Sequence, residues 1–235
     1  MTAHILIVED DEGLRRLLQI DLERNSYRVT TASDGIAGLE AFVRTSPDLV
    51  VLDVAMPGMS GREVCRRIRE ESDIPILMMS AHAITEEEIA EGLDIGADEY
   101  MVKPLGNIEF QARVNALLRR ANLARSHQKQ SSLAYDDGYL SVNLSTRRIR
   151  VGDKEIRLTP TEFNLLATFI EYRGKVLTFQ QILEMVWGAE YKSEHHYPRI
   201  YVSHLRRKIE PDYRQPTYIH NEYGVGYRFV GQLID

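Results

Sequence analysis

The chain has 235 residues, of which 43% are hydrophobic and 27% charged, a length that suits two domains with separate cores and a composition typical of soluble globular proteins. Its formal net charge of −6 conceals two unlike halves, because residues 1–122 carry a net charge of −9 and residues 123–235 one of +3. The single cysteine excludes an intramolecular disulfide and a cysteine-based metal site, and the lack of a long apolar run or a signal-peptide pattern predicts a cytoplasmic protein without membrane contact.

The first half alternates short apolar runs with amphipathic stretches, which predicts five strand–helix pairs. The predicted strands span residues 4–8, 28–32, 49–52, 74–79 and 99–102, and the predicted helices span residues 14–22, 35–43, 61–68, 86–93 and 108–118. The runs at 5–8 and 49–52 are apolar on both faces, as strands of a parallel sheet covered by helices must be. We therefore predict an α/β domain over residues 1–121, with a five-stranded parallel, doubly wound sheet of the flavodoxin-like order 2-1-3-4-5.

Polar residues follow four strands of this predicted sheet. Glu9 and Asp10 come directly after the first strand, and Asp53 ends the third. Because ligands of such sheets bind beyond the carboxyl ends of the strands, these carboxylates should converge, and a hard divalent cation such as Mg²⁺ or Mn²⁺ would relieve their repulsion. A carboxylate such as Asp53 can then attack a phosphoryl group and form an acyl phosphate. Ser80 and Lys103, which end the fourth and fifth strands, can bind the phosphoryl oxygens.

The motifs of this half resemble the receiver domain of response regulators, which has the CheY-like fold. The resemblance spans residues 3–120 and rests on Leu6–Asp11, Leu52–Gly58, Met79–Ala81, Gly96–Tyr100 and Lys103–Pro104. It implies that a partner sensor histidine kinase phosphorylates Asp53. The residues that it implies as ligands of the magnesium ion are Glu9, Asp10, Asp53 and, through its carbonyl, Ala55. It further implies that Ser80 and Lys103 bind the phosphoryl group, that Tyr100 is the rotating switch aromatic, and that the Lys103–Pro104 peptide is cis.

The resemblance also implies that the chain forms a homodimer on phosphorylation. Regulators of the OmpR/PhoB type usually pair a basic residue of the fourth helix with an acid of the fifth helix, across a face built from the fourth helix, fifth strand and fifth helix. Here Ile89 replaces the basic residue and Glu109 remains, while a second pair, Glu99 with Arg113, is retained. We therefore expect a dimer interface with an apolar component.

The second half has a different pattern. Residues 122–132 are polar and without periodicity, which predicts a linker. Three strand-like pieces and three helical stretches follow, and the end of the chain predicts a hairpin. The predicted strands are 139–142, 148–151 and 155–158, the helices 161–172, 179–187 and about 198–209, and the hairpin 218–230. This order predicts an α+β winged helix-turn-helix domain over residues 133–235.

The third of these helices is basic and amphipathic. Residues 195–209 contain four arginines or lysines, three histidines and no acid. On a helix, one apolar stripe is formed by Pro198, Val202, Leu205 and Ile209. The opposite face presents His196, Ile200, Ser203, His204 and Arg207, and it is flanked by Arg199, Arg206 and Lys208. Such a face suits the major groove of double-stranded DNA, where arginine can read guanine, an isoleucine can touch a thymine methyl and the flanking cations neutralise phosphates.

Residues 133–231 resemble the output domain of the OmpR/PhoB family, through Leu158–Phe163, Val186–Gly188, Leu205–Lys208 and Gly224–Phe229. The basic helix is most similar to the KdpE branch of that family. The resemblance implies base contacts from Tyr197, Ile200 and His204. It implies phosphate contacts from Trp187, His196, Arg199, Tyr201 and Arg206. Residues 189–194 correspond to the loop that meets RNA polymerase, and Tyr223 stands where many relatives have an arginine in the wing.

Three other hypotheses differ from a phosphorylation-controlled transcription factor. A phospho-dependent adaptor would bind a protein through its second half, which the acid-free helix disfavours. An aspartyl-phosphate hydrolase would usually have a second aspartate two residues after the nucleophile, where this chain has Ala55, so we expect at most slow self-dephosphorylation and no enzyme activity proper. A flavin-binding flavodoxin is disfavoured because acids line the crevice where a cofactor phosphate would lie.

Overall fold

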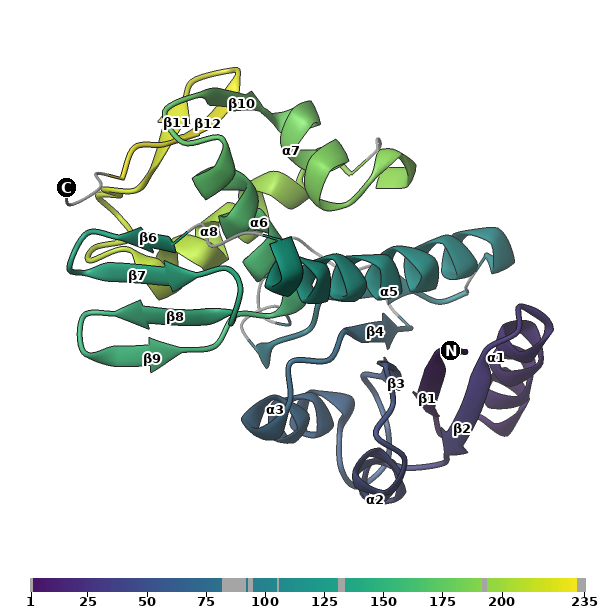
Figure 1. Cartoon of the computed structure of the whole chain (residues 1–235). Coiled ribbons are helices and arrows are strands. Elements are labelled where there is room, and N and C mark those ends of the chain that lie inside the picture. Colours follow the sequence, from purple (N-terminus) through teal and green to yellow (C-terminus); the bar gives the residue numbers. More distant parts are fainter. Residues whose placement is uncertain are drawn as a thin grey trace. The chain divides into compact units, whose positions relative to one another are not determined.

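The computed structural model describes residues 2–81, 92, 95–104, 106–130, 134–191 and 194–231. The chain divides into two compact units, Met1–Arg119 and Arg120–Asp235, which Figure 1 shows in purple to teal and in teal to yellow. Among the described residues, no helix is both long enough and apolar enough to span a membrane.

The first unit is built on a parallel sheet with the strand order β2-β1-β3-β4-β5. Its strands are β1 (His4–Val8), β2 (Arg28–Ala32), β3 (Leu49–Asp53), β4 (Ile76–Ser80) and β5 (Glu99–Val102). Its helices are α1 (Glu12–Arg24), α2 (Gly35–Thr45), α3 (Gly61–Glu71) and, as far as Arg119, α5 (Asn107–Gln130). The predicted doubly wound sheet and its order are confirmed, while the predicted helix at 86–93 lies almost wholly outside the described residues.

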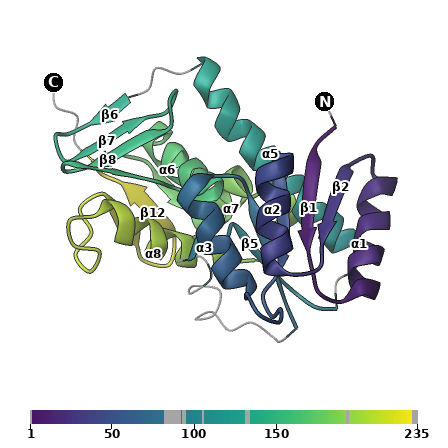
Figure 2. The ribbon, with the colours of Figure 1, turned by 90° about the horizontal axis from the view of Figure 1, so that it is seen from below.

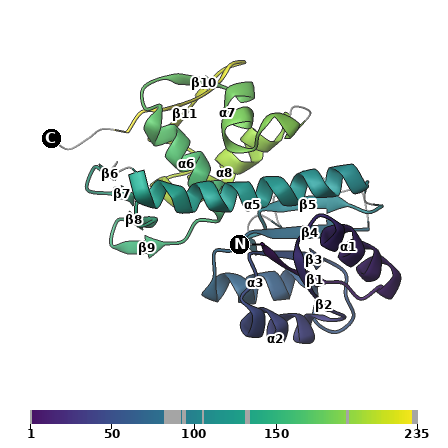
Figure 3. The same cartoon turned by 45° about the vertical axis from the view of Figure 1, so that its right-hand side comes forward.

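Both faces of this sheet are covered, as the doubly apolar strands predict. Leu6 and Val8 of β1 point to one side, where they pack with α2 and α3. Ile5 and Ile7 point to the other side, where they pack with α1 and α5. Figure 3 shows the two pairs of helices on opposite sides of the sheet. The alternation of side chains along each strand thus supplies two cores from one apolar run.

Helix α5 is longer than the sequence predicts. It continues from Asn107 to Gln130, so most of the predicted linker at 122–132 has a helical backbone. The segment lacks the apolar periodicity by which helices are recognised, but it also contains no glycine or proline to stop a helix. Once the packed part of α5 has formed, each further residue extends it without a new nucleation cost.

The second unit has two antiparallel sheets and three α-helices. Strands β6 (Ala134–Asp136), β7 (Leu140–Asn143), β8 (Arg148–Val151) and β9 (Lys154–Ile156) form one sheet in sequence order. Figure 2 shows β6, β7 and β8 side by side. Strands β10 (Val176–Thr178), β11 (Ile219–Glu222) and β12 (Gly226–Phe229) form the other in the order β10-β12-β11. The helices are α6 (Pro160–Glu171), α7 (Phe179–Val186) and α8 (Tyr197–Ile209), with a short 3₁₀ turn, η1, at Ala189–Tyr191. The predicted winged helix-turn-helix is confirmed.

Local signals set the starts of α6 and α7. At each start a threonine side chain accepts a hydrogen bond from a backbone N–H three residues on, and the side chain at that position bonds back to the threonine N–H. The two pairs are Thr159 with Glu162 and Thr178 with Gln181. These capping boxes satisfy N–H groups that a helix cannot pair internally, and they fix where each helix begins.

Candidate functional site

Three carboxylates meet at the carboxyl edge of the parallel sheet. One oxygen from each of Glu9, Asp10 and Asp53 lies within 4.8 Å of the others. Strands β1 and β3 pair in register up to Val8 and Leu52, so the residues that follow them emerge side by side. Glu9 and Asp53 are buried, and Asp10 is exposed. The convergence predicted from the strand ends is therefore what the structure shows.

Lys103 joins this cluster from the end of β5. Its Nζ lies 2.8 Å from Glu9 Oε2 and 3.0 Å from Asp53 Oδ1. Burial by itself lowers the pKa of Lys103, but the hydrogen bonds and charges of the two carboxylates outweigh this and raise it, so the ammonium stays charged. Burial also raises the pKa of Glu9, against the opposing effect of Lys103. One lysine thus offsets part of the charge of three carboxylates.

The oxygen donors fit a hard divalent cation. Mg²⁺ is bound in proteins by one or two carboxylates together with carbonyls and water, and it would neutralise the negative charge that Lys103 leaves unbalanced. Ala55, whose carbonyl was predicted as a further ligand, is exposed in the loop after β3, and its N–H donates to Asp53 Oδ1 at 3.4 Å. The loop therefore turns back toward the carboxylate that precedes it.

Two residues that sequence reasoning missed hold the backbone of this cluster. The Arg15 guanidinium of α1 donates to the carbonyl of Glu9 at 2.7 Å and to that of Asp10 at 3.1 Å. Gly61, the first residue of α3, lies against Asp53 so closely that a Cβ there would overlap the Asp53 carbonyl oxygen. Neither residue has a sequence signal of its own, because each acts on backbone atoms that the fold brings to it.

Ser80 and Tyr100 lie on the neighbouring strands β4 and β5, Ser80 at the strand end and Tyr100 two register positions before it. Ser80 is half-buried at the end of β4, and its carbonyl accepts a hydrogen bond of 2.7 Å from the Lys103 N–H. Tyr100, in β5, is only 8% exposed. Its ring lies against Gly92, where a Cβ would overlap the ring. The peptide between Lys103 and Pro104 is cis, as predicted.

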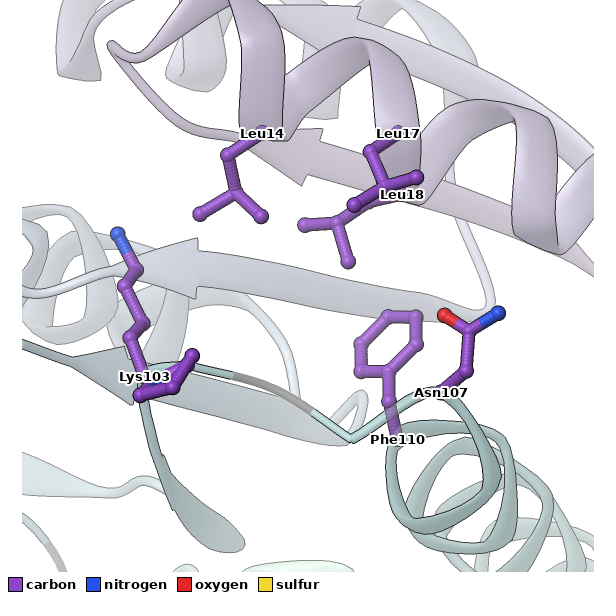
Figure 4. A pocket seen from close by; sticks show the side chains of 7 residues that line it. Leu14, Leu17, Leu18, Lys103, Asn107 and Phe110 are labelled. Carbon is purple, nitrogen blue, oxygen red and sulfur yellow. The ribbon is translucent and has the colours of Figure 1, made fainter.

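The stem of Lys103 also borders an apolar cavity of about 380 Å³ between α1 and the start of α5. Figure 4 shows the leucines of α1 on one side and Phe110 and Asn107 on the other. The lining residues are Leu14, Leu17, Leu18, Lys103, Pro104, Asn107 and Phe110. Lys103 therefore presents its methylene groups to the cavity and its ammonium to the acidic cluster.

Of the predicted dimer residues, the structure describes Glu99, Glu109 and Arg113, and these form ion pairs with one another within the chain. Arg113 Nη1 lies 3.2 Å from Glu99 Oε1, and Arg113 Nη2 lies 3.3 Å from Glu109 Oε1. Glu99 and Arg113 are buried, whereas the Glu109 side chain is 60% exposed. Ile89 lies outside the described residues.

In the second unit, α8 buries the predicted apolar stripe of Pro198, Val202, Leu205 and Ile209. Its exposed residues are Arg199, Ser203 and Arg207, which follow one another at four-residue intervals and so form one face. Two residues expected on the groove-facing side are covered in this structure, because Ile200 is 9% and His204 2% exposed. The exposed residues of α8 therefore include Ser203 and Arg207 of the predicted groove-facing side, together with Arg199 of its predicted flank.

Trp187, for which the family resemblance implies a phosphate contact and for which an ordinary core position was the alternative, belongs to an aromatic cluster. Its ring centroid lies 5.9 Å from that of Tyr197 and 4.9 Å from that of Tyr201, both in edge-on geometry. All three rings are buried, while His196, which packs edge-on against Tyr197, is half-buried. The core position of Trp187 explains why this residue type stands at the end of α7.

Arg206 is engaged by the hairpin formed by β11 and β12. Its Nε donates to the carbonyl of Ile219 at 3.1 Å, and its Nη2 donates to the Asn221 side chain at 3.0 Å. The guanidinium also lies over the ring of Tyr227, 5.4 Å from the centroid. Burial lowers the pKa of Arg206 without bringing its charge into question. The structure therefore gives this predicted phosphate ligand three contacts inside its own unit.

Comparison with known proteins finds one matching family for each of the two units. The chain matches the families described as "Response regulator receiver domain" over residues 5–115 and "Transcriptional regulatory protein, C terminal" over residues 153–229. It is 42% identical over 230 residues to YkoG of Bacillus subtilis, an uncharacterized transcriptional regulatory protein, with 97% of this chain and 99% of that protein covered. It is 40% identical over 228 residues to the KDP operon transcriptional regulatory protein KdpE of Escherichia coli, with 97% and 99% covered.

Similarity to solved structures supports the same family assignment. A RitR mutant superposes with a TM-score of 0.79 at 27% identity, over 97% of this chain and 100% of that one. DrrB, described as a Thermotoga maritima OmpR/PhoB homologue, matches with a TM-score of 0.50 at 30% identity, over 98% of this chain and 100% of that one. The chain belongs to the OmpR/PhoB family of response regulators, transcriptional regulators that join a receiver domain to a DNA-binding domain.

Proposed function

We propose that Asp53 is the phosphoacceptor of this response regulator and that a partner histidine kinase is the phosphoryl donor. The observation that supports this most directly is the position of Asp53 at the end of β3, buried beside two further carboxylates and 3.0 Å from Lys103 Nζ. A carboxylate oxygen of Asp53 attacks the phosphorus and forms an O–P bond. The N–P bond of the phosphohistidine breaks, and the imidazole nitrogen keeps the electron pair and takes up a proton.

Glu9, Asp10, Asp53 and the Ala55 carbonyl are the residues that we assign to the cation, Mg²⁺ or Mn²⁺. When bound, this cation supplies positive charge that screens the incoming phosphoryl oxygens. Lys103 exchanges a carboxylate partner for a phosphoryl oxygen, and the Ser80 hydroxyl donates a hydrogen bond to another. Tyr100 then changes its orientation as the switch residue. Hydrolysis of the acyl phosphate by the protein itself is slow, because Ala55 offers no carboxylate to activate water.

The assignment is tested by labelling with acetyl phosphate and magnesium, followed by intact-mass measurement. Wild type should gain the mass of one phosphoryl group, and Asp53→Asn should gain none. Asp11→Asn is the matched control, since Asp11 accepts a hydrogen bond from the Leu14 N–H at the start of α1 and asparagine caps helices equally well. Equal labelling of wild type and Asp53→Asn would disprove the assignment, and removal of Mg²⁺ by a chelator should abolish the labelling.

We further propose that phosphorylation produces a homodimer through the face that carries Ile89, Glu99, Glu109 and Arg113, and that the dimer binds promoter DNA in the cytoplasm. The domains are taken as residues 1–121 and 133–235, joined by 122–132.

Arg199, Ser203 and Arg207 are exposed on α8, which supports their contact with DNA. We also propose base contacts by Tyr197, Ile200 and His204. The proposed phosphate contacts include those of Trp187, His196, Tyr201 and Arg206. All of these side chains are less exposed than Arg199, Ser203 and Arg207. Residues 189–194 are proposed to meet RNA polymerase.

A gel shift with promoter fragments at several salt concentrations tests the output function. Binding to duplex DNA that weakens steeply as salt rises is expected, because phosphate contacts release counterions. A phosphorylated protein that retains a protein partner but binds no duplex would instead support the adaptor hypothesis.

A further inference from the structure

The acidic cluster depends on how the chain leaves β1. Side chains of a regular strand alternate between the two faces of a sheet, so a continued β1 would send Glu9 and Asp10 to opposite sides. One carboxylate oxygen of each nevertheless lies within 4.8 Å of the other and of an oxygen of Asp53. Strand β1 ends at Val8, and the backbone departs from strand geometry beyond it. Whatever holds this departure therefore places two of the three carboxylates.

Arg15 of α1 is bonded to the backbone of both residues. Its Nη1 donates to the Glu9 carbonyl at 2.7 Å and to the Asp10 carbonyl at 3.1 Å. Successive carbonyls of a regular strand point in opposite directions, so one donor atom reaches two of them only where the chain turns between them. The Arg15 side chain is half-buried, which limits the competition of water for these bonds. Arg15 therefore holds the turn between Glu9 and Asp10.

The charge of Arg15 works against the same site. The side-chain hydrogen bonds that the structure describes for Arg15 go to carbonyls, whereas Lys103 forms ion pairs with the carboxylates of Glu9 and Asp53. A guanidinium repels a divalent cation bound nearby, which by itself would lower the affinity of the site for the ion. Arg15 thus has two effects of opposite sign on cation binding, one from its charge and one from its hydrogen bonds.

We propose that Arg15 is a positioning residue for the divalent cation, and that its two backbone hydrogen bonds raise the affinity of the site by more than its charge lowers it. The inference rests on the proposed assignment of Glu9, Asp10 and Asp53 to Mg²⁺ or Mn²⁺. Carboxylates that are already in place lose less conformational freedom when the ion binds, so a residue that holds their backbone adds to the affinity without touching the ion.

The neighbouring Arg16 offers a matched control. It carries the same charge one residue further along α1, but its side chain is exposed and donates to Gln19 of the same helix at 3.2 Å. Arg15→Met and Arg16→Met remove equal charge, and only the first removes the bonds to the turn. We expect Arg15→Met to bind Mn²⁺ about tenfold more weakly than wild type, as is usual when a supporting contact of a metal ligand is lost. Arg16→Met should bind Mn²⁺ as well as wild type or slightly better.

Mn²⁺ binding is measured on the full-length, unphosphorylated protein from the electron paramagnetic resonance signal of the free ion, so that no phosphoryl transfer enters the result. Asp53→Asn should weaken binding and thereby locate the ion. Arg15→Lys, which keeps the charge but not the guanidinium, should have an affinity between those of wild type and Arg15→Met. The effect of Arg15→Met should shrink in an Asp10→Asn background, because both changes act on the same ligand.

Labelling by acetyl phosphate gives a second readout. Arg15→Met should need more Mg²⁺ than wild type for half-maximal labelling and should reach nearly the wild-type rate at saturating Mg²⁺, since the residue acts on cation binding. Melting without metal ions shows whether the first unit of each variant is folded. If Arg15→Met is unfolded, Arg15→Lys decides, and a Mn²⁺ affinity equal to that of wild type would then overturn the proposal.

The outcomes separate this inference from the function on which it rests. A Mn²⁺ affinity that is equal or higher in Arg15→Met than in wild type would overturn the positioning role, because the charge would then dominate. Equal weakening in Arg15→Met and Arg16→Met would overturn it as well. Wild-type Mn²⁺ binding that Asp53→Asn leaves unchanged would instead refute the proposed cation site.

Discussion

Gly61 shows how one missing side chain shapes the surroundings of Asp53, the proposed phosphoacceptor. A Cβ at this position would overlap the carbonyl oxygen of Asp53, which is backbone and cannot rotate away. We expect Gly61→Ala to lower the free energy of unfolding of the first unit by about 1–3 kcal/mol, the usual cost of overpacking, and to slow the labelling of Asp53. Urea unfolding and mass spectrometry measure the two effects. Gly13→Ala is the control, because its Cβ would meet only the Asp11 side chain, at 3.2 Å. A loss of stability equal in both variants would contradict the explanation.

His4 gives the first unit a dependence on pH at the opposite end of β1. Burial, aided by the charge of Arg28, lowers the pKa of His4 from its ordinary value of 6.5. Below that value the unfolded chain binds a proton that the folded chain resists, so the folded state loses stability as pH falls toward the lowered pKa. Unfolding at about pH 7.5 and about pH 5.5 should show a larger loss for wild type than for His4→Gln. His195→Gln, a change at an exposed histidine, should behave as wild type. Parallel losses in all three proteins would exclude His4 as the cause.

The residues of the acidic cluster were predictable because they follow strands, and the residues that support them were not. A residue directly after a parallel strand must emerge at the carboxyl edge of the sheet, so Glu9, Asp53 and Lys103 could be placed together without coordinates. Arg15 reaches the backbone of Glu9 and Asp10, and a contact with a carbonyl leaves no mark in the identity of its partner. The same holds for Arg206 and the carbonyl of Ile219.

Among the elements, the end of α8 is linked to the start of β11 by the carboxylate of Glu210. Glu210 accepts hydrogen bonds from the N–H groups of Thr217, Tyr218 and Ile219, the last at 2.9 Å. Three such bonds to one buried acceptor are charge-assisted and therefore strong. The start of β11 is thus fastened to the end of α8 by Glu210 as well as by Arg206.

We expect Glu210→Ala to destabilise the second unit by about 1–3 kcal/mol per amide left without a buried acceptor, tempered by water that reaches the gap. Hydrogen exchange should be accelerated at the Tyr218 and Ile219 amides before it changes in α6. Glu155→Ala, at an exposed acid of β9, should change neither stability nor exchange. Unchanged protection of the two amides in Glu210→Ala would show that other contacts hold the hairpin.

Element lengths were less predictable than element order. The strands with both faces apolar and the helix with the buried stripe at 198–209 were placed to within a residue or two. Strands β6 and β10 were missed, since each has only three residues and a period of two needs more than that to be recognised. The helical backbone at 122–130 was missed because the sequence of that segment has no apolar period, although it has no glycine or proline to oppose a helix either.

At the scale of the whole molecule, the geometry of Arg113 changes how dimerisation should be tested. Its guanidinium is buried with Glu99 in the same chain, so Arg113→Ala would remove a charged ion-pair partner from a buried carboxylate. Breaking such a pair costs about 3–5 kcal/mol and would weaken the fold together with any interface. Glu109, whose side chain is 60% exposed, can be changed without this penalty.

We therefore expect sedimentation of the protein treated with a phosphoryl mimic to show a dimer, and Glu109→Ala to weaken it modestly, since an exposed ion pair contributes only about 0–1 kcal/mol. The monomer should melt at nearly the same temperature with and without this substitution. Asp53→Asn should remain monomeric in the presence of the mimic, which provides the negative control. A wild-type protein that stays monomeric with the mimic at high concentration would refute the proposed dimer.

The cavity beside Lys103 offers a route to chemical control of the regulator. Lys103 borders the cavity with its stem and pairs with Glu9 and Asp53 through its ammonium. A molecule bound in the cavity is therefore expected to affect Asp53 through this one side chain. In a screen of small apolar molecules against this cavity, the rate of Asp53 labelling can therefore be used to detect binding. We expect a compound that fills the cavity and displaces the stem of Lys103 to change the rate at which Asp53, the proposed phosphoacceptor, is labelled, without competing for the acidic cluster itself.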